Sequence, residues 1–235
     1  MKKGDLRRGQ ILDTAEKLFF EQGYDRTSIQ DILDALRLSK GGFYHYFDAK
    51  ETVLREICER RWVGRYERIR LEQMAARKNP VDKLNQLLTQ ANLFEAEDVR
   101  FAALLLKLCY RDRDASIRDY RRRVLIDQLA PQVSDVILEG VEAGKLHSRF
   151  PLGIGRLLLL LACDINDEAC EILTADPENP DRMIRIIELL NTYRESVEML
   201  CGAPYGSIRL FDPAQMLDTW HGVMEELGRL EESEL

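Results

Sequence analysis

Apolar residues recur every three to four positions along almost the whole chain, and no run alternates apolar and polar residues as a half-buried strand would. In the segment 7–22, for example, Ile11, Ala15 and Phe19 fall on one helical face. This periodicity predicts an all-α protein. Beyond Asn79-Pro80, the first clear break after the N-terminal unit, we expect helices over residues 81–96, 99–112, 115–144, 152–174, 181–201 and 213–230.

The stretch from Thr27 to Lys50 predicts two short helices joined by a tight turn. Thr27 and Gln30 have the spacing of a capping box, so Thr27 is expected to cap the first of these helices. Ser39 is the expected cap of the second. A long fourth helix should start near residue 50 and run to about residue 78.

The second short helix begins with Lys40, Gly41 and Gly42. Two glycines at a helix start cost roughly 1 kcal/mol each against alanine, which suggests a close approach of the backbone to a ligand. Free N–H groups at a helix start also suit a phosphate. A plain loop-to-helix transition and a solvated lysine are the alternatives.

Tyr44, His45 and Tyr46 follow, and Lys50 opens the next helix. Tyrosine hydroxyls and a lysine suit phosphate contacts, and a histidine between them could reach a base edge. The alternative for each aromatic residue is half-buried packing.

The N-terminal segment closely resembles the DNA-binding domain of the TetR family of bacterial transcriptional regulators over about residues 6–60. The positions that match the family pattern are Ala15, Leu18, Phe19, Gly23, Tyr24, Thr27, Ser28, Ile29, Ile32, Ser39, Lys40, Gly41, Phe43, Tyr44, Tyr46, Phe47, Lys50 and Glu51. Arg37 departs from it, because the family commonly has glycine in this turn. A left-handed backbone there would be strained for arginine.

The resemblance implies that double-stranded DNA is the partner. It implies phosphate contacts by Thr27, Ser28, Tyr44 and Lys50. It implies base readout by Gln30, Lys40, Gly41 and His45, with Gly41 acting through its backbone. Ser39, Gly42 and Tyr46 complete the expected DNA-binding set.

The resulting organisation is an N-terminal three-helix, helix-turn-helix domain at residues 1–50, followed by a helical ligand-binding and dimerisation domain at residues 51–235. The long fourth helix joins the two. Residues 1–61 hold 12 basic and 11 acidic residues, whereas the remaining 174 hold 22 and 30. A relatively basic end on an acidic body, within a net charge of −7, permits nucleic-acid binding at that end.

For the C-terminal part, the resemblance implies a homodimer and a pocket for a small-molecule inducer. The segments 152–174 and 181–201 offer broad apolar surface for the dimer, with monomer core as the alternative. Residues that could line an aromatic pocket, or pack as ordinary core, are Trp62, Tyr66, Phe94, Phe101, Leu105, Cys109 and Tyr110. Six arginines between Arg111 and Arg123 could serve an anionic inducer, although an ion-paired solvated face is the alternative.

Five cysteines without a C-x-x-C motif, and no signal peptide, indicate buried reduced thiols in a cytoplasmic protein. The longest apolar run, Leu157–Cys163, is too short to span a bilayer, so no membrane role is expected. No spacing indicates a metal site or a cofactor.

We therefore expect a dimeric repressor that a ligand releases from its operator. The alternatives are a helix-turn-helix regulator that acts constitutively or through a protein partner, and an all-helical enzyme. No catalytic motif supports the enzyme.

Overall fold

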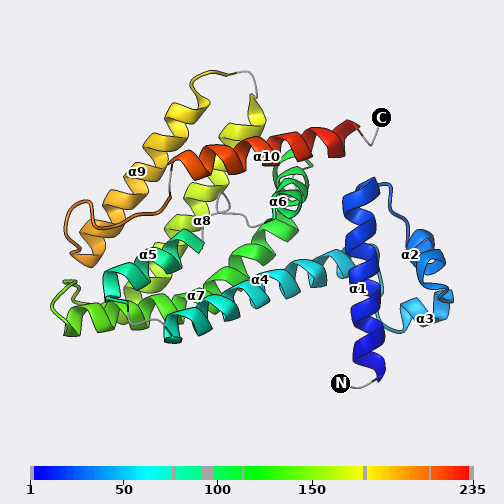
Figure 1. Cartoon of the computed structure of the whole chain (residues 1–235), viewed down its shortest axis with the longest axis horizontal. Helices are drawn as coiled ribbons and strands as arrows, with labels where there is room; N and C mark the ends of the chain where they lie inside the picture. The colour runs from blue at the N-terminus through cyan, green and yellow to red at the C-terminus, as the bar shows by residue number, and fades with distance from the viewer. Residues whose placement is uncertain are drawn as a thin grey trace.

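The computed structural model describes residues 3–75, 78–90, 98–112, 114–176, 179–211 and 213–232. This described part is helical and contains no strand, which confirms the expected all-α class (Figure 1). Its elements are α1 (Lys3–Gln22), α2 (Ile29–Leu36), α3 (Lys40–Tyr44), α4 (Lys50–Ala75), α5 (Pro80–Gln90), α6 (Val99–Leu106), the π-helical turn η2 (Lys107–Arg111), α7 (Ala115–Glu142), α8 (Pro151–Ala175), α9 (Arg182–Cys201) and α10 (Pro213–Glu232).

Two features differ from the pattern expected for the C-terminal helices. The helix expected over residues 99–112 changes at Lys107 from α to π winding, which apolar spacing does not reveal. Pro131 lies inside α7, where a proline removes one backbone hydrogen bond, yet the helix continues through it. The side-chain amide of Gln132 donates to the carbonyl of Gln128, 2.9 Å away, in the turn that the proline disturbs.

Ser28, and not Thr27, caps α2. The Ser28 hydroxyl accepts from the Asp31 N–H, and the Asp31 carboxylate accepts from the Ser28 N–H, so the capping box lies one residue later than predicted. Thr27 is buried, and its hydroxyl donates to the Gly23 carbonyl at 2.7 Å. Thr27 therefore fixes the loop between α1 and α2.

The turn between α2 and α3 has the left-handed backbone that is strained for arginine. Arg37 has φ 49° and ψ 47°, and it is the one residue other than glycine with positive φ in the described ranges. Its N–H ends α2 by donating to the carbonyl of Asp34. The turn therefore keeps the geometry that suits glycine, at the cost of local strain.

Helices α1 to α3 form a small unit at one side of the molecule, and α4 leads from it toward α5 and α7 (Figure 1). Phe43 and Phe47 are buried together with Phe19 and Ile32. Because α4 packs against both α1 and α7, a single helix connects the small unit to the C-terminal helices.

Among the C-terminal helices, α7 packs along α8, α9 lies beside α8, and α10 crosses α6 (Figure 1). The segment 207–211, between α9 and α10, is neither helix nor strand. Its backbone pairs with the side chain of Asn85 in α5, which donates to the Ser207 carbonyl and accepts from the Arg209 N–H. Ile208 and Leu210 are buried on either side of Arg209.

All five cysteines are buried and form no disulfide, as expected. Within the described residues, no helix combines the length and apolar character needed to span a membrane.

Replacing Arg37 with glycine should raise the free energy of unfolding by up to about 1 kcal/mol. A residue with a Cβ atom loses about 1–2 kcal/mol in the left-handed conformation, and glycine avoids this cost. Glycine in turn loses about 0.5–1 kcal/mol more conformational entropy on folding, which offsets part of the gain. Ala35→Gly, at an exposed position inside α2, is the matched control and should lower it by about 1 kcal/mol. Denaturant titration measures both changes. Equal or lower stability of the Arg37 variant would mean that its side-chain contacts outweigh the strain.

Candidate functional site

The exposed face of α3 carries most of the expected DNA-binding residues. Ser39 caps this helix, with its hydroxyl accepting from the Gly42 N–H at 3.2 Å. Lys40, Gly41 and His45 are exposed, and 55% of Tyr44 is exposed although it is a large aromatic residue. Because α3 is anchored from behind by Phe43, this face can enter a groove without losing its own packing.

The two glycines of α3 have different surroundings. A Cβ atom on Gly42 would lie 2.8 Å from Cδ1 of Leu38, so a larger residue here would have to displace the Leu38 side chain. A Cβ atom on Gly41 would meet no atom within 4 Å. Packing among the described residues therefore does not require a glycine at this position, and the Gly41 backbone is open to close approach from outside.

At the start of α2, Ser28 and Gln30 are exposed. The Gln30 amide donates to the Asp34 carboxylate at 2.8 Å, a contact that it would exchange to reach a base edge. Thr27 does not join this set. Its side chain is fully buried and its hydroxyl donates to the Gly23 carbonyl, so Thr27 has no exposed group for the expected phosphate contact in this arrangement.

Lys50 and Tyr46 are only partly exposed. The Lys50 ammonium donates to the Tyr24 carbonyl at 2.7 Å and lies 4.2 Å from the centre of the Tyr24 ring. Burial lowers the pKa of Lys50. Tyr46 packs edge-on against His45, with ring centres 4.9 Å apart. Lys50 thus holds the α1–α2 loop, and any phosphate contact must share its ammonium with that loop.

Comparison with known proteins supports a DNA-binding role for the α3 surface. Residues 11–57 match the family model described as "Bacterial regulatory proteins, tetR family". The chain is 25% identical over 191 residues to the HTH-type transcriptional repressor Rv1474c of Mycobacterium tuberculosis, covering 81% of this chain and 94% of the relative. It is 29% identical over 147 residues to the HTH-type transcriptional repressor KstR2 of Rhodococcus jostii, covering 61% and 68%. The chain belongs to the TetR family of transcriptional regulators.

The whole fold agrees with this assignment. A crystal structure of a TetR-family transcriptional regulator from Pectobacterium atrosepticum matches with a TM-score of 0.60 at 18% identity, over 87% of this chain and 100% of the other. At that identity the likeness supports the fold alone. The similarity in fold covers the C-terminal helices of this TetR-family chain as well as the DNA-binding helices.

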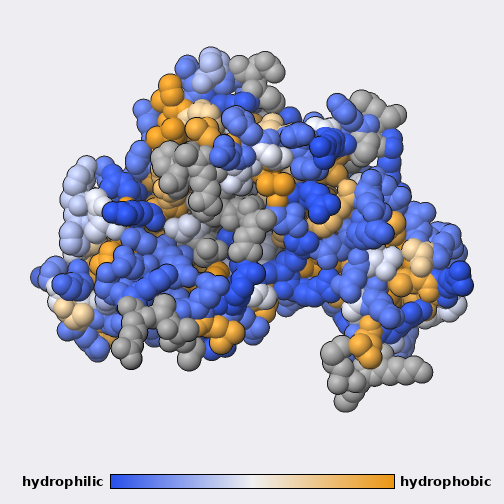
Figure 2. Space-filling model, viewed as in Figure 1, coloured by the Kyte–Doolittle hydropathy of each residue, from blue (hydrophilic) through white to orange (hydrophobic). Residues whose placement is uncertain are grey.

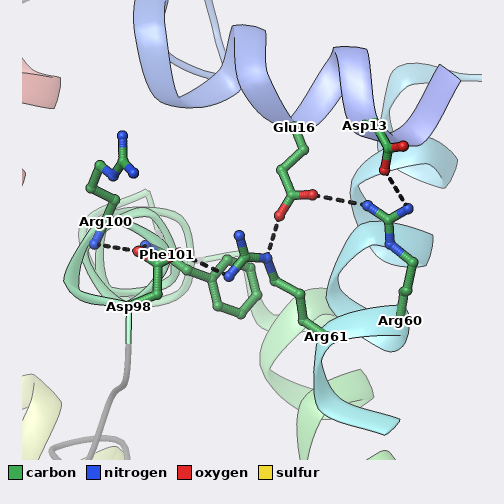
Figure 3. Close-up of polar contacts among 7 residues, drawn as sticks. All are labelled: Asp13, Glu16, Arg60, Arg61, Asp98, Arg100 and Phe101. Atoms are coloured by element: carbon green, nitrogen blue, oxygen red, sulfur yellow. Dashed lines mark hydrogen bonds and ion pairs between the residues drawn. The ribbon is translucent and has the colours of Figure 1, made fainter. Parts of the chain in front are cut away.

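A polar cluster fixes the DNA-binding helices of this regulator against α4 and α6 (Figure 3). Arg61 of α4 donates through Nε to Glu16 of α1, and through Nη1 to Asp98 at 2.9 Å. Arg60 donates to Asp13 and Glu16. The other carboxylate oxygen of Asp98 caps α6 by accepting from the N–H groups of its first turn. One carboxylate therefore starts α6 and links it to α4.

The C-terminal helices contain a half-open pocket of about 580 Å³ beside η2. The lining residues are Cys109, Tyr110 and Arg111 of η2, Arg118 of α7, and Glu171, Thr174 and Ala175 of α8. Arg118 and Glu171 form an ion pair at 3.5 Å across this wall. Burial raises the pKa of the Cys109 thiol to about 12, so this thiol stays neutral.

Only part of the expected pocket lining lies at this pocket. Cys109 and Tyr110 are on its wall, whereas Trp62, Tyr66, Phe101 and Leu105 are buried elsewhere in the helical core. Trp62 packs against Phe101 with ring centres 6.4 Å apart. Phe94 lies outside the described residues. Arg111 and Arg118 belong to the run of arginines that was expected to serve an anionic inducer. The aromatic candidates were chosen by residue type, so Thr174 of α8 was missed.

Gly41→Ala should weaken operator binding by about 1–3 kcal/mol while leaving the fold intact or more stable, since the new methyl group faces open space in the free protein. Fluorescence anisotropy with a duplex selected from a random library measures binding, and thermal unfolding measures stability. Gly42→Ala is the contrast, because it must displace Leu38 and should lose stability. Unchanged operator affinity of Gly41→Ala would exclude a close backbone approach.

Proposed function

We propose that this TetR-family regulator is a homodimeric repressor that binds a pseudo-palindromic operator and is released when a small molecule occupies its C-terminal helices. Residues 1–50 would read the DNA, and residues 51–235 would bind the ligand and the second subunit. As a repressor it works on the chromosome in the cytoplasm and needs no catalytic step. The exposed α3 face, with Gly41 open to solvent beside Lys40, is the observation that carries the proposal.

Exposed apolar residues on α8 and α9 support the homodimer. Leu157 of α8 is 44% exposed, and Ile184 and Ile187 of α9 are 58% and 37% exposed. Figure 2 shows hydrophobic surface gathered over the upper part of α9. Two subunits that pair these helices would bury this surface in a helix bundle. A two-fold axis there would present both α3 helices to successive major grooves, about 34 Å apart.

The connection through α4 supports release by a ligand. Because α4 packs on both α7 and α1, a shift of α5 to α7 around a ligand moves α1 to α3 with it. The ligand would need higher affinity for the shifted arrangement than for the DNA-bound one, and this difference supplies the energy for release. The pocket beside η2 favours this model over a regulator without a small-molecule ligand.

Lys40→Ala should weaken operator binding by about 1–3 kcal/mol and relax the preference for operator over random DNA, because a base-reading contact is lost. Tyr44→Phe removes one hydroxyl and should weaken binding to both DNAs alike, as a phosphate contact does. Anisotropy titrations with operator and random duplexes separate the two effects. Operator affinity that Lys40→Ala leaves unchanged would remove the proposed role of Lys40.

The double substitution Ile184→Glu and Ile187→Glu should convert the dimer to monomer, because it places charges in the proposed apolar interface. Sedimentation velocity measures the oligomeric state, and circular dichroism checks that the helices remain. Leu217→Glu changes a similarly exposed leucine on α10 and should leave the dimer intact. A double variant that still sediments as a dimer would place the interface elsewhere.

A further inference from the structure

A single turn of the chain contacts both the pocket and the DNA-binding helices. Cys109, Tyr110 and Arg111 of η2 line the pocket, and Lys107 begins the same turn. The Lys107 side chain is only 7% exposed, and its ammonium lies 3.1 Å from the carboxylate of Asp25 in the α1–α2 loop. Any displacement of the pocket wall at η2 therefore acts directly on the loop that precedes α2.

The π winding of η2 lowers the free-energy cost of such a displacement. A π turn carries one extra residue between hydrogen-bonded partners, is less favourable than α winding, and occurs often at functional sites. Here the Asp112 N–H donates to the Lys107 carbonyl at 2.9 Å, which closes the turn. A return to α winding would rotate the residues at one end of η2 by about one helical position relative to the other.

The wall of the pocket has guanidinium groups as its main remaining donors. The Tyr110 hydroxyl already donates to Asp167 at 2.6 Å, and the Thr174 hydroxyl donates to the Cys170 carbonyl at 2.8 Å. A guanidinium has five N–H donors in a planar fork. In the described part of the chain, Arg111 and Arg118 each use this fork for an ion pair whose N–O distance is 3.4 or 3.5 Å.

Those two ion pairs are suited to exchange. Arg118 lies 3.5 Å from Glu171, and Arg111 lies 3.4 Å from Glu231. The carboxylate side chains are 64% and 44% exposed, whereas the arginines are 30% and 32% exposed. Since a solvated carboxylate loses little when its partner leaves, an anion inside the pocket can replace both glutamates.

We propose that this pocket is the effector site, and that it takes a small organic anion whose carboxylate or phosphate group binds Arg111 and Arg118 in place of Glu231 and Glu171. Its volume of about 580 Å³ is in the usual range for a small-molecule site. Occupancy shifts η2 and, through Lys107, the hold on Asp25. The inference rests on the proposed function, because it names the ligand class of that regulator and the contact that transmits binding.

Inorganic phosphate, exchanged for chloride at constant ionic strength, is the first probe. At about ten times its dissociation constant it should raise the melting temperature of the wild-type dimer by about 2–5 °C. The double variant Arg111→Gln, Arg118→Gln should lose this shift. Arg123→Gln, which changes an exposed arginine of α7 outside the pocket wall, should keep it. No shift in the wild type, or an equal shift in the double variant, would overturn the anion site.

The transmission is tested with Asp25→Asn, which breaks the contact between Lys107 and the loop from its exposed side, and leaves Lys107 with Asp112 at 2.9 Å. Phosphate should weaken operator binding of the wild type about ten times more than it weakens operator binding of the double variant Arg111→Gln, Arg118→Gln, in which the anion site is lost. Asp25→Asn should still gain thermal stability from phosphate but lose this tenfold response. A full response in Asp25→Asn would overturn the transmission. Operator binding without phosphate tests the proposed function separately.

Discussion

The guanidinium of Arg61 links its own helix, α4, to α1 and α6. It donates to Glu16 of α1 and to Asp98 at the start of α6, and it lies 4.6 Å from the ring centre of Phe101. Asp98 in turn caps α6, a contact typically worth about 1 kcal/mol. The placement of the DNA-binding helices against the C-terminal helices therefore depends in part on charged, half-exposed groups that also determine where α6 begins.

Ionic contacts between the two units cost less free energy to change than apolar contacts would. Burial of apolar surface contributes about 25 cal/mol per Å², so separating two well-packed helices would cost many kcal/mol. Exchanging a partly exposed ion pair such as Arg61–Asp98 or Lys107–Asp25 costs roughly 1 kcal/mol or less for the exposed partner, and more for the buried lysine. The apolar core can keep each unit folded while the ionic contacts between units change within the free energy that a small ligand supplies.

The sequence was sufficient for most of the fold because helical periodicity and caps are local. The C-terminal helices start and end close to where apolar spacing placed them, and Arg37 has the strained conformation that the turn implied. The cap of α2 was assigned one residue too early, since Thr27 and Ser28 are both good caps and only tertiary burial separates them. The π winding of η2 has no local signature, so the turn that joins pocket and loop was not predictable.

The pocket was harder to predict than the DNA-facing helix for a similar reason. On α3, one inward residue, Phe43, sets the orientation of a single short helix, so the outward residues are known once the inward one is. The pocket wall combines residues from η2, α7 and α8, which come together only after the helices pack. Aromatic type favoured Trp62 and Phe101, but large rings usually fill space and leave no cavity, as they do here.

The residues whose local conformation or burial is unusual for their type lie along the proposed route from the pocket to the DNA-binding face. Arg111 and Arg118 are charged groups at a pocket wall, η2 is wound as a π turn, and Lys107 is a buried lysine that holds the loop before α2. Beyond α2 follow Arg37 in a left-handed turn and Gly41 without an internal reason. Natural chains tend to keep such irregularities where function requires them, because selection for stability alone would remove them. Their order from pocket to groove is the order in which a ligand signal would have to travel.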